Sequence, residues 1–245
     1  MSHAIHCSVR GESEVQGGRK FLLDFRRNGE PIPAVLLFPH AAGPVPASLL
    51  LHGLSLDKER MAEMAGPALM RRGIASVALD LPLHGERSRG RNPVSTDNPF
   101  EMVTRWREAL DESALVLRYL ADRPDVDAAR ISLVGYSLGA FIGLKVASAN
   151  AMVSSLVLAA GGDLPDHTPF IGLVRTVADP IRMARNLKSR RLLMLHGRYD
   201  RAVTPAQAER LFKAAPEPKK MSWWDCGHLL PPQAIDEAAA WLSER

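Results

Sequence analysis

The chain has 245 residues, of which 46% are hydrophobic and 24% charged, a composition typical of one soluble globular domain. Its formal net charge of +4 is too small to indicate a nucleic-acid-binding surface, and no apolar run approaches the roughly 20 residues of a membrane span. The N-terminus lacks the basic start and apolar core of a signal peptide, so we expect a cytoplasmic protein in which Cys7 and Cys226 are free thiols.

Apolar runs alternate with helical patterns along the chain. Strands are expected over the first half-dozen residues and at Lys20–Arg26, Pro31–Pro39, Ala47–His52, Ile74–Asp80, Ile131–Tyr136, Ser154–Ala160, Arg191–His196 and Met221–Trp224. Helices are expected at Asp57–Arg72, Phe100–Ala121, Pro180–Leu187, Pro205–Ala215 and Gln233–Glu244. The opening strands are expected to be antiparallel, whereas the later, continuously apolar ones are typical of a parallel sheet buried on both faces. The pattern predicts an α/β fold with a mostly parallel, twisted sheet of about eight strands and helices on both faces.

We expect one domain over residues 1–245, because the sequence shows no internal repeat and no linker. Residues 161–190 separate two expected strands and contain a short apolar segment and a short helix. We interpret this insert as a small or minimal lid.

The segment that organises the chain is Gly135-Tyr136-Ser137-Leu138-Gly139, a Gly-x-Ser-x-Gly turn between an apolar strand and a helix. Glycines two residues before and after the serine let strand and helix pass close together and leave the hydroxyl exposed at the sheet edge. This nucleophile elbow makes Ser137 the expected nucleophile.

A serine nucleophile needs a histidine base, and the base needs an acidic partner that fixes its tautomer. Asp200 follows the strand Arg191–His196, and His228 follows the last strand, so all three side chains are expected at one edge of the sheet. The order Ser137, Asp200, His228 is that of a Ser-Asp-His triad in a strand-turn-helix fold. Asp163, after the preceding strand, is the rival candidate for the acid.

A tetrahedral intermediate also needs two hydrogen-bond donors aimed at its oxyanion. The backbone amide of Leu138 directly follows the nucleophile, and the amide of Leu54 follows the strand that ends at His52. We expect these two amides to form the oxyanion hole and His52 to brace the loop.

The chain resembles the α/β-hydrolase superfamily over nearly its whole length, and in detail the compact dienelactone-hydrolase-like and prolyl-oligopeptidase-like serine esterases. The matching motifs are His52-Gly53-Leu54, Asp80-x-x-x-His84-Gly85, Asp200-x-x-Val203-x-Pro205 and Gly227-His228. The chain has no Gly-Gly after Gly53 and no propeller domain, which argues against a true lipase or a large oligopeptidase. In the family, the position of His84 is a loop brace.

The expected function is that of a carboxylesterase-type serine hydrolase that cleaves short acyl esters through an acyl-enzyme on Ser137. A thioesterase, an aminoacyl-ester or peptide hydrolase and an acyltransferase remain open, and a non-catalytic small-molecule binding protein on the same fold is the alternative from another class. The triad requires no cofactor, and no cluster with metal-ligand spacing suggests a metal. We expect a small-molecule ester as partner, neither nucleic acid nor membrane, and a monomer or a homodimer.

Three arginines lie close together in the loop after Asp80, namely Arg87, Arg89 and Arg91. Arginine in a partly desolvated site binds carboxylate or phosphate, so this loop is a candidate for recognising an anionic group on the substrate. The alternative is a solvated basic loop whose charges pair with Glu86 or with nothing.

Overall fold

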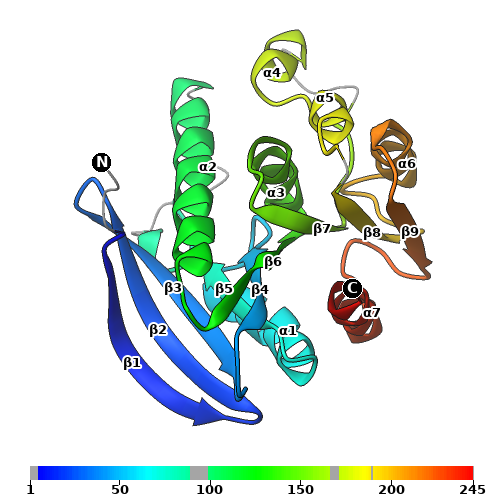
Figure 1. Cartoon of the computed structure of the whole chain (residues 1–245). Helices are drawn as coiled ribbons and strands as arrows, with labels where there is room; N and C mark the ends of the chain where they lie inside the picture. Colours follow the sequence, from blue (N-terminus) through cyan, green and yellow to red (C-terminus); the bar gives the residue numbers. More distant parts are fainter. Residues whose placement is uncertain (1–4, 89–98, 166–170, 189, 245) are drawn as a thin grey trace.

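The computed structural model describes residues 5–88, 99–165, 171–188 and 190–244. Its strands are β1 (Cys7–Val15), β2 (Gly18–Arg27), β3 (Glu30–Pro39), β4 (Val45–Leu51), β5 (Ala75–Leu79), β6 (Val126–Tyr136), β7 (Val153–Ala159), β8 (Arg191–Gly197) and β9 (Lys219–Trp224). They form one sheet in the order β1-β2-β3-β5-β4-β6-β7-β8-β9 (Figure 1). The pairs from β1 to β5 are antiparallel and those from β5 to β9 are parallel. The expected mostly parallel sheet is confirmed, with nine strands instead of about eight.

Helices cover both faces of this sheet. They are α1 (Lys58–Arg71), α2 (Pro99–Ala121), α3 (Leu138–Ala149), α4 (Ile171–Val177), α5 (Pro180–Arg185), α6 (Pro205–Ala214) and α7 (Pro232–Ser243), with a 3-10 turn η1 at Gly85–Arg87. Helices α1 and α7 lie on one face of the sheet, and α2, α3, α5 and α6 lie on the other (Figure 1). The buried side chains of these two groups of helices belong to two separate core layers. All five residues of β5 are buried, as expected for a strand that is covered on both faces. None of the described helices is long and apolar enough to cross a membrane.

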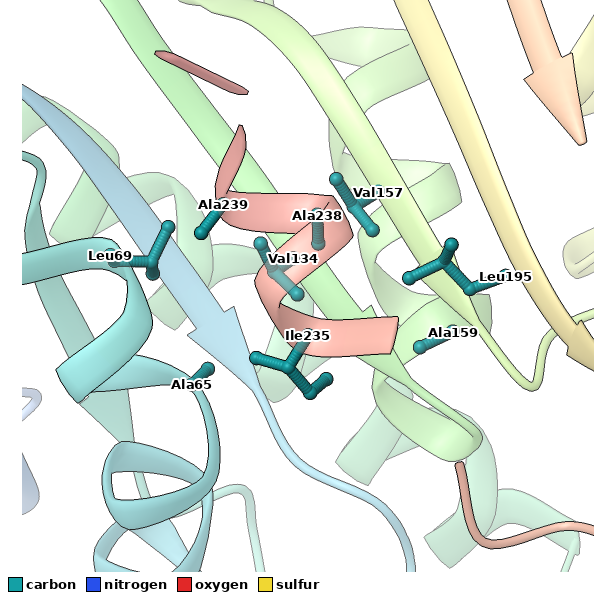
Figure 2. Close-up of a pocket in the computed structure, with 9 residues that line it drawn as sticks. All are labelled: Ala65, Leu69, Val134, Val157, Ala159, Leu195, Ile235, Ala238 and Ala239. Carbon is teal, nitrogen blue, oxygen red and sulfur yellow. The ribbon is translucent and has the colours of Figure 1, made fainter. Parts of the chain in front are cut away.

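The core layer beneath α7 contains a small void of about 10 Å³ between α1, α7 and the sheet (Figure 2). Its lining is entirely apolar: Ala65, Leu69, Val134, Val157, Ala159, Leu195, Ile235, Ala238 and Ala239. A buried water needs polar partners as well as about 10 Å³ of space, so this void is a packing imperfection and not a polar binding site.

Two elements differ from the sequence-based expectation. The first described strand is Cys7–Val15, and residues 5 and 6 are not part of it. Residues 1–4, where a strand was also expected, lie outside the described part. Most side chains of β1 are exposed, with Val9 at 60%, because β1 is an edge strand that pairs on one side only. Such a solvated strand lacks the apolar run that marks a buried one. The second is α4, expected only as a short apolar segment.

A chain of charges joins the first strand to the loop after β5. Arg10 donates two hydrogen bonds to Glu86, at 2.7 and 2.8 Å, and Lys58 Nζ lies 2.7 Å from Glu86 and 3.0 Å from Asp80. The cations of Arg10 and Lys58 lower the pKa of Glu86 to about 2. Lys58 and Asp80 are buried, so each is the other's charge compensation in a place where an unpaired ion is costly. These contacts fix the loop that starts at Asp80 against the N-terminal strands.

Candidate active site

The turn between β6 and α3 holds Ser137 in a conformation that an L-residue rarely adopts, with φ 51° and ψ −111°. Its amide donates to the carbonyl of Ala159 on β7, at 2.9 Å. A Cβ on Gly135 would lie 2.3 Å from the carbonyl oxygen of Gly139, and a Cβ on Gly139 would lie 2.0 Å from that of Leu51. Both glycines are therefore required by the close packing of strand and helix, as the motif predicts.

We expect Gly139→Ala to lower the free energy of unfolding by about 3 kcal/mol, because the new methyl group meets sheet backbone that cannot move aside. Gly43→Ala is the matched control, since a Cβ there has no atom of the described chain within 4 Å. Urea unfolding followed by tryptophan fluorescence measures both changes. Equal midpoints for Gly139→Ala and Gly43→Ala would contradict the packing argument.

The structure brings the side chains of Ser137, His228 and Asp200 together at the carboxyl edge of the parallel strands. His228 Nε2 lies 2.9 Å from Ser137 Oγ, and His228 Nδ1 lies 2.8 Å from Asp200 Oδ2. Asp200 is buried, and its Oδ1 accepts hydrogen bonds from the amides of Ala202 and Val203, at 2.8 and 3.0 Å. The carboxylate is thus held by the backbone on one oxygen and faces the imidazole with the other.

Asp163, the rival candidate for the acid, binds different partners. Its Oδ2 accepts from Arg175 at 3.0 Å and from Arg210 at 3.2 Å, and its carbonyl accepts from Gln207 at 2.8 Å. These contacts tie the loop after β7 to α4 and α6. The geometry therefore favours Asp200 over Asp163 as the partner of the histidine.

The segment expected to supply the oxyanion donors lies beside the nucleophile. A Cβ on Gly53 would lie 3.5 Å from Ser137 Cβ, so the peptide that leads to Leu54 runs next to the serine. Leu138 begins α3, where backbone amides have no partner within the helix. His84 Nε2 lies 2.8 Å from the carbonyl oxygen of Leu54, which fixes the orientation of this segment. The loop-brace role that the resemblance implies for His84 agrees with this contact.

His52 braces the same region from inside the core. Its Nδ1 donates to the carbonyl of Gly53 at 2.8 Å, and its Nε2 accepts from the amide of Leu81 at 3.1 Å. One ring nitrogen thus donates and the other accepts, which fits a neutral imidazole. Desolvation lowers the pKa of His52 to about 4. The expected brace is confirmed.

This buried histidine makes stability depend on pH. Its pKa falls from 6.5 to about 4 on folding, so between these values the unfolded chain binds a proton that the folded one does not. The free energy of unfolding therefore has its full value above pH 6.5. It decreases by about 3 kcal/mol as the pH falls towards 4, because protons then bind His52 preferentially in the unfolded chain. Urea unfolding at neutral pH and near pH 4 should show a smaller decrease for His52→Gln than for the wild type. His6→Gln, at an exposed position, should behave like the wild type; identical pH dependence in all three proteins would contradict the argument.

The arginine loop is only partly described. Arg87 binds the buried Glu112 through two hydrogen bonds, at 2.6 and 2.8 Å, and donates to the carbonyl of Asp80. Its guanidinium is therefore engaged in an internal ion pair, which argues against a contact with substrate. Arg89 and Arg91 lie outside the described residues.

One residue that has no signature in the sequence contacts the candidate site. Tyr136, the residue before the nucleophile, donates its hydroxyl hydrogen to the backbone carbonyl of His228. In the motif it occupies a variable position, so the motif itself gives no signal for it. Its position directly before Ser137 is the only sequence feature that could have drawn attention to it.

A parallel sheet with a serine at a strained strand-to-helix turn, and a histidine and an aspartate on later loops, defines the class of α/β hydrolases. The model of the Alpha/beta hydrolase family matches residues 49–242, and the chain belongs to this family.

Similar proteins agree with this assignment. The uncharacterized protein Rv2307c of Mycobacterium tuberculosis is 30% identical over 190 residues, which cover 75% of this chain and 63% of that protein. Esterase FrsA of Salmonella newport is 29% identical over 122 residues, which cover 49% of this chain and 26% of the esterase. The chain thus spans less than two thirds of the length of either relative.

Two solved structures share the fold. A cold-adapted esterase from an Arctic intertidal metagenomic library superposes with a TM-score of 0.75 at 20% identity, covering 96% of this chain and 98% of that one. Acetyl xylan esterase 1 from Thermoanaerobacterium sp. superposes with a TM-score of 0.74 at 18% identity, covering 99% of this chain and 88% of that one.

Proposed function

We propose that the protein is a serine hydrolase that cleaves carboxylic esters through an acyl-enzyme on Ser137. The observation that carries the proposal is the continuous hydrogen-bond relay from Ser137 Oγ to His228 and on to Asp200, with distances of 2.9 and 2.8 Å. The names of the similar proteins support ester hydrolysis, since FrsA and both solved structures are called esterases.

In the proposed mechanism, His228 Nε2 takes the proton of Ser137 Oγ while that oxygen attacks the ester carbonyl. Asp200 holds the proton on Nδ1 and stabilises the imidazolium that forms. The amides of Leu54 and Leu138 donate hydrogen bonds to the oxyanion of the tetrahedral intermediate. The intermediate collapses, and the departing alcohol takes the proton from His228.

The second half of the reaction repeats these steps with water. His228 removes a proton from a water molecule, whose oxygen attacks the acyl carbon. Collapse of the second intermediate releases the carboxylic acid and returns the proton to Ser137. No step requires a cofactor or a metal ion.

Short acyl esters are the proposed substrates. The segment 161–190 is proposed to be a small cap on a single domain, and its two described helices, α4 and α5, have only seven and six residues. So short an insert offers little material for a deep lipid tunnel.

We also propose that the protein is located in the cytoplasm, which fits its two free cysteines, Cys7 and Cys226.

A panel of p-nitrophenyl esters, from acetate to palmitate, tests the proposal. We expect the highest kcat/KM for the short acyl chains and no turnover by Ser137→Ala. A matched thioester and a matched anilide in the same assay separate esterase from thioesterase and amidase activity. Absence of turnover on the entire panel, together with no fluorophosphonate labelling of Ser137, would favour a binding protein on this fold.

A further inference from the structure

Tyr136 lies where three parts of the proposed active site meet. It is the last residue of β6, it directly precedes Ser137, and its side chain is buried. Its ring lies beside that of His228, with centroids 6.0 Å apart and planes at 70°. A Cβ on Gly53 would come within 3.4 Å of its Cδ1 atom, so the ring also packs against the oxyanion segment.

The hydroxyl group of Tyr136 makes two hydrogen bonds to the loop that carries the histidine. It donates to the carbonyl oxygen of His228 at 2.6 Å and accepts from the amide of Leu230 at 3.2 Å. Both partners are backbone groups, so the hydroxyl holds the loop itself and not a mobile side chain. The two bonds enclose the loop on either side of Leu229.

The first half of the same loop is held differently. The amide of Tyr199 donates to the carbonyl of Cys226 at 3.0 Å, and the carbonyl of Gly227 lies close to Gly197, where a Cβ would approach it to 2.1 Å. These contacts join the loop to the end of β8, near Asp200. The part of the loop before His228 is thus bound to the end of β8, which precedes Asp200. The part after His228 is bound to the end of β6, which precedes Ser137.

We propose that Tyr136 is a positioning residue that holds the loop of His228 at a fixed distance from Ser137. The inference rests on the proposed function of the triad. The connection is short, because the phenol belongs to the residue next to the nucleophile and bonds to the backbone of the base. Small displacements of a general base reduce its rate strongly, so a rigid link between the two residues contributes to turnover without touching substrate.

The two hydrogen bonds require a neutral phenol, which donates through its proton and accepts through a lone pair. Burial raises the pKa of Tyr136 above its ordinary value, so the hydroxyl keeps its proton at neutral and moderately basic pH. The two hydrogen bonds of the Tyr136 hydroxyl, which we call the clamp, therefore persist over the pH range in which a histidine acts as a base.

Tyr136→Phe removes the hydroxyl and keeps the ring, and Tyr119→Phe is the matched control. Tyr119 is a partly buried residue of α2 whose hydroxyl accepts a hydrogen bond from Arg123 at 2.7 Å, away from the triad. With p-nitrophenyl acetate, we expect kcat of Tyr136→Phe to fall roughly 10- to 100-fold with KM within about threefold of the wild type. Tyr119→Phe should keep the wild-type kcat.

A second measurement does not depend on turnover. In the wild type and in Tyr119→Phe, the Nδ1 proton of His228 should give a downfield NMR resonance from its hydrogen bond to Asp200. In Tyr136→Phe we expect that resonance to broaden through faster exchange with water. The acid limb of the kcat/KM profile should also move to lower pH, because a looser loop weakens the hydrogen bond that stabilises the imidazolium.

The inference is overturned if Tyr136→Phe keeps the wild-type kcat, acid limb and NMR resonance, or if Tyr119→Phe loses as much activity. Inactivity of the wild type towards esters would refute the proposed function alone, since the NMR comparison still decides the clamp. If Tyr136→Phe does not fold, hydrogen exchange of the Leu230 amide in the wild type provides the test. Protection supports the clamp, and exchange at the rate of an exposed amide overturns it.

Discussion

Ser137→Ala should reduce ester turnover about a millionfold, the loss seen when a serine hydrolase loses its nucleophile. The substitution removes the oxygen that we propose as the nucleophile and leaves the turn, because alanine has the same Cβ as serine. Residual hydrolysis would come from water attacking a substrate bound near the oxyanion donors. The measurement is kcat/KM for p-nitrophenyl acetate, together with fluorophosphonate labelling located by mass spectrometry.

Ser154→Ala controls for the loss of a serine hydroxyl. Ser154 lies at the start of β7, and its hydroxyl donates to the carbonyl of Ile131 on β6. This position is at the opposite end of the parallel strands from the triad. We expect full activity and wild-type labelling in that variant. Labelling of Ser137→Ala at another serine, with activity retained, would show that the nucleophile lies elsewhere.

Asp200→Asn should reduce turnover by about ten-thousandfold through the wrong histidine tautomer. One carboxylate oxygen of Asp200 accepts from the amides of Ala202 and Val203, and an amide group keeps its oxygen there because its nitrogen cannot accept. The new NH2 group then faces His228 Nδ1 and donates to it. The proton moves to Nε2, which can no longer take the proton of Ser137.

Asp163→Asn separates this effect from a general loss of charge near the sheet edge. We expect that variant, once folded, to hydrolyse esters at close to the wild-type rate, since Asp163 binds Arg175 and Arg210. A full-rate Asp200→Asn combined with an inactive Asp163→Asn would mean that the acid is Asp163. The pH dependence of kcat/KM should be recorded for both variants.

The sequence predicted the sheet because its central strands are buried on both faces and their composition records that burial. It also indicated the three residues that meet at the edge, since each follows a strand and carries a local signature: glycines around Ser137, Asp-x-x-Val-x-Pro at Asp200 and Gly-His at His228. Parallel strands all end at the same edge, so placing each residue after a strand was enough to bring them together.

Other features depend on contacts that leave no local signature. Tyr136 bonds to backbone groups of residues 228 and 230, and every residue has such groups, so no pattern in the sequence marks the partner. The ion pair of Arg87 with Glu112 joins the segment after β5 to the middle of α2. The sequence does not distinguish a charged residue that is paired inside the protein from one that faces solvent. The polar edge strand β1 lacked the apolar run by which the other strands were found.

The ion pairs that link Arg10, Glu86, Lys58 and Asp80 limit how far the chain could be shortened from its N-terminus. The family match begins at residue 49, so β1, β2 and β3 lie outside it, yet Arg10 and Lys58 share Glu86 beside the loop that carries His84. A fragment cut at that boundary would also remove β3 from β5 and leave β5, with four apolar residues and Ser76, as an open strand edge. Exposed apolar edges pair with other chains, so such a fragment should aggregate. The three opening strands thus cover the edge of β5 and protect the hydrolase sheet from pairing with other chains.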